Sequence, residues 1–90
     1  MSKRVHVTVT GRVQAVGFRY SVVQQAQELG LTGWIRNRDD GDVEAEFQGS
    51  SEAVEEAVIF CRDGPRHARV RDVEVTPREL IEDEERFSVR

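Results

Sequence analysis

Arg19 and Asn37 are the residues of this chain whose types and positions are best suited to chemistry on a bound anion. Arg19 ends the segment Gly11-Arg12-Val13-Gln14-Ala15-Val16-Gly17-Phe18-Arg19, which leads from a predicted strand into a predicted helix. In such a turn, backbone N–H groups and the positive end of the helix dipole point at one small volume. The Arg19 guanidinium adds a planar fork of donors that matches phosphate oxygens. The segment therefore predicts a phosphate-binding loop formed by Gln14, Ala15, Val16, Gly17, Phe18 and Arg19.

Asn37 lies at the end of the next predicted strand, within Gly33-Trp34-Ile35-Arg36-Asn37-Arg38-Asp39-Asp40-Gly41-Asp42-Val43. Its side-chain amide both donates and accepts hydrogen bonds and does not ionise, so it can orient a water molecule. Phosphoryl transfer requires positioning and charge stabilisation more than covalent help. We therefore predict that Arg19 stabilises the charge that builds in the transition state, while Asn37 orients the attacking water. Such a site has no general acid, so it suits a phosphate whose leaving group is a carboxylate.

Together the two segments resemble the two signatures of the acylphosphatases, with Gly49 closing the second one. The resemblance extends over essentially the whole chain. It implies hydrolysis of acyl phosphates to a carboxylate and inorganic phosphate, with Arg19 and Asn37 as the catalytic side chains and no metal or other cofactor. The substrates that it implies include acetyl phosphate, carbamoyl phosphate and 1,3-bisphosphoglycerate.

Two positions depart from the family pattern. Ala15 stands where the family usually has glycine, and Ile35 stands where valine is common. Ala15 is the more important difference, because alanine adopts a positive φ at a higher cost than glycine.

The spacing of apolar residues predicts how these segments are positioned. We expect strands over residues 5–10, 31–38, 43–47 and 70–76, helices over 19–30 and from Ser50 or Ser51 to 63, and a possible short strand at 87–89. Val73 and Val75 are out of phase with Val70, which indicates a bulge or a late start of that strand. The order βαββαβ predicts an α+β, ferredoxin-like fold, with two helices covering one face of an antiparallel sheet.

This topology brings the two candidate residues together. A helical connection between the first two strands makes them run parallel, so their carboxyl ends lie at the same edge of the sheet. We therefore expect Arg19 and Asn37 to be neighbours in space.

Composition narrows the class of protein. Ninety residues with 33% charged side chains fit one domain, residues 1–90, and the net charge of −4 disfavours a nucleic-acid-binding protein. No apolar run reaches the roughly 20 residues that span a bilayer, and no secretory signal is visible. We expect a cytoplasmic monomer that acts on a small-molecule acyl phosphate, with no nucleic-acid or membrane partner.

Other residues with reactive side chains are expected to be structural. Cys61 falls on the apolar stripe of the second helix, and Trp34 is expected to pack rather than contact substrate. His6 is predicted to face water together with Thr8 and Thr10, His67 to lie in a loop, and the acidic run 82–85 to be solvated. Arg12, Arg36 and Arg38 lie near the edge of the site and are expected mainly to be surface residues.

Three other functions are compatible with parts of this sequence. The chain could be an anion-binding or acyl-phosphate-binding module without turnover. It could be an RNA-binding domain, but the open sheet face would then display Glu44 and Glu46 in place of the usual aromatic residues. It could be a domain of a larger maturation factor of carbamoyl chemistry, which should continue into cysteine-rich metal motifs. A single cysteine favours a free-standing enzyme.

Overall fold

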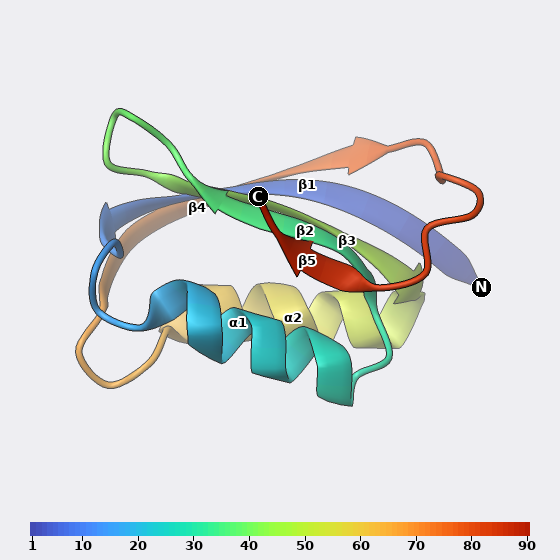
Figure 1. Ribbon diagram of the computed structural model, residues 1–90, viewed down its shortest axis with the longest axis horizontal. Coiled ribbons are helices and arrows are strands. Elements are labelled where there is room, and N and C mark those ends of the chain that lie inside the picture. Colours follow the sequence, from blue (N-terminus) through green and yellow to red (C-terminus); the bar gives the residue numbers. More distant parts are fainter.

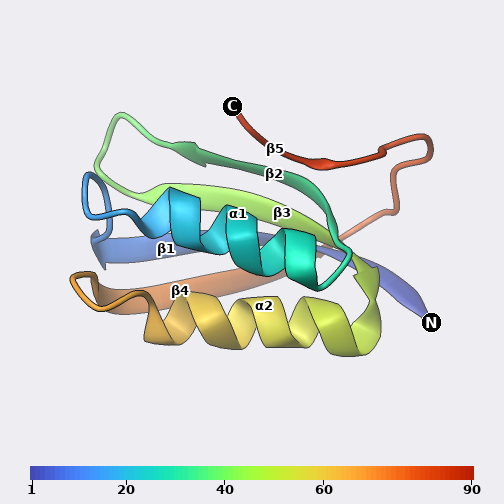
Figure 2. The same ribbon diagram turned by 60° about the horizontal axis from the view of Figure 1, so that its bottom comes forward.

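The chain forms five strands and two helices in the computed structural model, which describes all residues from 1 to 90. The elements are β1 (Ser2–Arg12), α1 (Phe18–Glu28), β2 (Thr32–Asn37), β3 (Val43–Ser50), α2 (Ser51–Asp63), β4 (Arg69–Arg78) and β5 (Phe87–Val89). They form a 5-stranded sheet of order β4-β1-β3-β2-β5. Both helices lie on the same face of this sheet (Figure 1; Figure 2). The predicted ferredoxin-like fold is confirmed.

The possible fifth strand is real, and it changes the character of the sheet. Four strands pair in antiparallel fashion, but β5 pairs with β2 in parallel, Gly33 lying opposite Phe87. The sheet is therefore mixed, and the predicted antiparallel sheet is correct only for β1 to β4. Phe87 is 4% exposed and stacks on Phe47 at 5.4 Å between ring centroids. This contact holds the end of the chain against the core.

The core lies between the helices and the inner face of the sheet. Strand periodicity points alternate residues of β1 toward the helices, so Val5, Val7 and Val9 are buried. Each helix contributes a narrow apolar stripe to the core. On α1 the stripe includes Val22 and Ala26. On α2 it consists of Val54, Ala57 and Cys61. Neither helix is both long and apolar enough to cross a bilayer.

The irregularity predicted near Val70 is a bulge between β1 and β4. Thr10 pairs with Asp72 and Gly11 with Val70, which leaves Arg71 as the extra residue. At Gly11, with φ 133°, a Cβ atom would lie 2.1 Å from the Arg69 carbonyl oxygen. The first glycine of the phosphate-binding signature is therefore required by the close approach of two strands.

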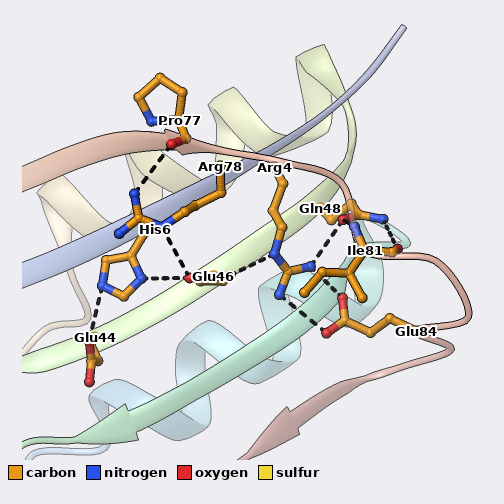
Figure 3. Close-up of polar contacts among 9 residues, drawn as sticks. All are labelled: Arg4, His6, Glu44, Glu46, Gln48, Pro77, Arg78, Ile81 and Glu84. Atoms are coloured by element: carbon orange, nitrogen blue, oxygen red, sulfur yellow. Dashed lines mark hydrogen bonds and ion pairs between the residues drawn. The ribbon is translucent and has the colours of Figure 1, made fainter.

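The outer face of the sheet carries a network of polar side chains centred on Arg4 and Glu46 (Figure 3). Arg4 is only 2% exposed, and it binds Glu46 at 2.6 Å and Glu84 at 2.7 Å. His6 Nδ1 lies 2.8 Å from Glu46, and His6 Nε2 lies 3.0 Å from Glu44. The prediction that His6 simply faces water is wrong, because carboxylates on the neighbouring strand β3 enclose its ring.

The expectation that the acidic run 82–85 is solvated holds for Glu82, Asp83 and Glu85, which are exposed, but not for Glu84. Its side chain is 16% exposed, since Arg4 draws it onto the sheet. Burial by itself would lower the pKa of Arg4, but hydrogen bonds and charges from Glu84 and Glu46 raise it overall. The pair joins residues 80 positions apart in sequence and ties the segment before β5 to β1.

Candidate functional site

The loop between β1 and α1 is fastened at both ends by buried side chains. Val13 and Phe18 are each 1% exposed, and Val16 packs against the core between them. None of the backbone N–H groups from Gln14 to Gly17 donates a hydrogen bond within the protein. The loop therefore holds a series of unused donors on a backbone that the core keeps in place.

The first turn of α1 adds further donors at the same position. Its N-cap is Gly17, with φ 78°, and no side chain caps the helix or places a carboxylate in its first turn. The first N–H groups of a helix have no partner inside the helix, and the helix dipole makes this end positive. An uncapped helix start that follows free loop N–H groups is a binding site for an anion.

Ala15 adopts the left-handed conformation with φ 60°, although it is not glycine. This conformation costs an L-residue about 1–2 kcal/mol, whereas glycine in its place raises the entropic cost of folding by about 0.5–1 kcal/mol. We therefore expect Ala15→Gly to increase the free energy of unfolding by about 0.5–1 kcal/mol. Urea unfolding followed by circular dichroism measures this change.

Ala57→Gly is the matched control for that substitution. Ala57 is in the middle of α2 and 2% exposed, so its replacement is expected to destabilise the protein by at least about 1 kcal/mol. If both variants lost stability to the same extent, the left-handed conformation of Ala15 would not be a source of strain.

The side chain of Gln14 joins the loop to the β2–β3 hairpin. Its Nε2 donates to the carbonyl oxygens of Arg38 at 2.7 Å and Asp42 at 2.9 Å. From the sequence, only the backbone N–H of Gln14 was expected to bind phosphate. No neighbouring residue indicates which group the long Gln14 side-chain amide contacts. The contact places the loop beside the end of β2, where Asn37 precedes Arg38.

Arg19, the second residue of α1, makes no ion pair and no side-chain hydrogen bond within the protein. The two arginines that flank Asn37 are different, since Arg36 pairs with Glu44 and Arg38 pairs with Asp40. Those pairs agree with the surface role predicted for Arg36 and Arg38. The charge of Arg19 is thus left without compensation at the positive end of a helix, a position that is unfavourable for a cation.

Asn37 ends β2 with its side-chain oxygen buried. Its Oδ1 accepts no hydrogen bond from the protein. It is the one buried side-chain nitrogen or oxygen atom that has no hydrogen-bond partner. A buried acceptor without a partner costs stability, so it requires an explanation. An amide oxygen can accept a hydrogen bond from a water molecule or from a hydroxyl group of a ligand.

Other reactive groups do not gather at this edge of the sheet. Cys61 is in the core, and burial raises the pKa of its thiol to about 12, which keeps it protonated and unreactive. Trp34 is on the outer face, with its ring 5.8 Å from that of His6 and 4.8 Å from the Arg90 guanidinium. No group of three or more His, Cys, Asp or Glu side chains is arranged to hold a metal ion.

These features define a class: a ferredoxin-like α+β protein with a backbone loop for an anion, an unpaired arginine and a buried amide acceptor. The family model of acylphosphatase matches residues 5–89. The chain belongs to the acylphosphatase family, whose members are hydrolases that act on acyl phosphates.

Named relatives support this assignment. An acylphosphatase of Trichormus variabilis is 62% identical over 72 residues, which cover 80% of this chain and 71% of the relative. One of Nitrobacter winogradskyi is 51% identical over 87 residues, covering 91% and 88% respectively. Among solved structures, the acylphosphatase of Bacillus subtilis has a TM-score of 0.93 at 39% identity and covers 100% of this chain and 99% of its own.

Proposed function

We propose that this chain hydrolyses acyl phosphates without a metal ion, through Arg19, Asn37 and the backbone of residues 14–19. Residues 1–90 form one catalytic domain that works as a cytoplasmic monomer on small molecules, with no nucleic-acid partner. The observation that supports the proposal is that unused binding groups lie on two segments, the β1–α1 loop and the end of β2, which the Gln14 side chain joins. Free loop N–H groups, an unpaired guanidinium and a buried unpartnered amide oxygen belong to segments that the Gln14 side chain holds together.

The loop binds the phosphoryl group of the substrate. N–H groups of Gln14 to Arg19 donate to its oxygens, and Arg19 adds charged hydrogen bonds. These donors are fixed before substrate arrives, because Val13, Val16 and Phe18 anchor the loop in the core. Donors that do not have to reorganise as charge builds stabilise the transition state most effectively.

Asn37 directs the water that attacks phosphorus. Its Oδ1 accepts a hydrogen bond from the water and aligns it opposite the leaving carboxylate. The bond between phosphorus and the water oxygen forms as the bond to the carboxylate oxygen breaks, and the carboxylate leaves with the bonding pair. The proton of the water passes to a phosphoryl oxygen, which gives inorganic phosphate without an acid or base from the protein.

Hydrolysis of benzoyl phosphate by purified protein in the presence of EDTA tests this proposal. We expect release of phosphate under these conditions and little release from alkyl or aryl phosphate monoesters, because no residue is placed to protonate a poor leaving group. Comparable rates on both types of substrate would reveal a missed general acid. Activity lost in EDTA and restored by a divalent ion would contradict the metal-free mechanism, and binding without turnover would indicate an anion-binding module.

The pH profile for benzoyl phosphate is expected to be broad. The proposed mechanism uses a guanidinium and an amide, neither of which changes protonation in the working range, so kcat should change little between about pH 5 and 8. A bell shape is the mark of an essential acid and base. The histidines are the side chains that normally titrate in this range. A steep limb near pH 6.5 that disappeared in His6→Gln or His67→Gln would show that a histidine takes part.

A further inference from the structure

A hollow of about 420 Å³ adjoins the phosphate-binding loop on its β4 side. It is lined by Arg12, Val16, Arg66, His67, Ala68 and Arg69. Arg12 ends β1, and the residues from 66 to 69 belong to the α2–β4 loop and the start of β4. Figures 1 and 2 show the loop after β1 and the loop before β4 at the same end of the molecule. Val16 belongs to both the hollow and the predicted phosphate-binding loop, so the two sites share a wall.

The three arginines of this hollow have no acidic partners. Arg12, Arg66 and Arg69 form no ion pair and no side-chain hydrogen bond within the protein, whereas Arg36 and Arg38, which flank Asn37, both pair with carboxylates. The chain has 17 acidic residues and a net charge of −4, so acids are available elsewhere. No carboxylate lines the hollow, which leaves its positive charge free for an anion from outside.

The pairing of the strands brings two of these charges together. Arg12 and Arg69 are directly opposite each other in the antiparallel ladder of β1 and β4. Like charges in opposed positions destabilise a sheet. An anion bound between the two guanidinium groups would relieve this repulsion, and Arg66 and His67 could add further donors.

We infer that Arg12, Arg66 and Arg69 form a subsite for a second anionic group, carried by the acyl portion of the substrate. The inference rests on the proposed function, because it assumes that the loop holds the phosphoryl group. With that group in the loop, the acyl portion is the part of the substrate free to reach past Val16 into the hollow. Acyl phosphates that carry a carboxylate or a second phosphate are then better substrates than those with an uncharged acyl group.

Benzoyl phosphate and its 3- and 4-carboxy derivatives test this subsite. The readout is the ratio of kcat/KM for each carboxylated substrate to kcat/KM for benzoyl phosphate. We expect a ratio of about ten for at least one derivative, falling toward one in the double variant Arg66→Gln/Arg69→Gln. Arg86→Gln is the control for loss of surface charge in general, since it removes one positive charge from an exposed residue just before β5. The preference should also shrink as potassium chloride is raised from 20 mM to about 500 mM.

The outcomes distinguish failure of the subsite from failure of the proposed function. If no substrate is hydrolysed by the wild-type protein, the proposed function fails. If benzoyl phosphate is hydrolysed but neither derivative is preferred, or if Arg86→Gln changes the ratio as much as the double variant, the subsite is overturned. If the double variant weakens inhibition by free phosphate and leaves the ratio unchanged, the arginines bind a separate anion and the assignment to the substrate is wrong.

Discussion

Replacing Arg19 with alanine is expected to lower kcat/KM for benzoyl phosphate by about 10²–10³-fold, the usual cost of removing one preorganised donor to a transition-state charge. The guanidinium has no other partner in the protein, so its charge is available to the phosphoryl group in both the ground state and the transition state. Phosphate affinity should therefore fall together with kcat. Initial rates and competitive inhibition by inorganic phosphate measure the two effects.

Two further variants make the Arg19 result specific. Arg19→Lys keeps the charge but loses the planar fork of donors, so it should recover only part of the activity. Arg86→Ala removes an exposed arginine just before β5 and should leave both kcat and phosphate affinity unchanged. Because Arg19 makes no ion pair and no side-chain hydrogen bond within the protein, its alanine variant should unfold at a urea concentration close to that of the wild type. Activity within threefold of wild type in Arg19→Ala would remove this residue from the mechanism.

The features that sequence predicted correctly depend on local or repetitive patterns. The alternation of Val5, Val7 and Val9 indicated a half-buried strand, and the broken phase of Val73 against Val70 indicated a bulge, which the structure has. The serine N-cap of α2 was also foreseen, since Ser50 accepts a hydrogen bond from the Ala53 N–H at 3.2 Å. These signals lie within a few residues of the feature that they predict.

The features that sequence missed depend on strand register and on contacts between distant segments. Arg4 meets Glu84 only because β5 pairs beside β2 and brings the preceding acidic run over the sheet. His6 meets Glu46 because the two are cross-strand partners in the pairing of β1 with β3. The amide of Gln14 reaches carbonyl groups of the next hairpin in a similar way. No short window of sequence contains both members of any of these pairs.

The glycines of the two family signatures are of two kinds. Gly11 and Gly33 both have φ near 135°, and a Cβ at Gly33 would lie 1.9 Å from the Glu46 carbonyl oxygen. Both are therefore needed where strands approach closely. Gly17 has open space around its Cβ position and is instead the left-handed N-cap of α1. Only this last glycine shapes the proposed phosphate-binding loop directly.

Asn37→Ala is expected to lower kcat by about 10²-fold while leaving the affinity for inorganic phosphate close to that of the wild type. The side chain is proposed to hold the water and not the substrate, so its loss affects the step in which water attacks. Single-turnover rates and phosphate inhibition distinguish this result from that of Arg19→Ala. A loss of phosphate affinity as large as in Arg19→Ala would contradict the separate roles of the two residues.

Stability provides an independent check on Asn37. Its Oδ1 is buried without a partner in the protein, and removal of such an atom relieves a cost of about 1–3 kcal/mol. Asn37→Ala should therefore retain or increase the free energy of unfolding, so that lost activity cannot be attributed to a damaged fold. Asn37→Asp retains an acceptor for the water but adds a negative charge beside the phosphoryl group, and like charges repel. We expect this variant, unlike Asn37→Ala, to bind phosphate several-fold more weakly, because an amide at this position provides an acceptor without a charge.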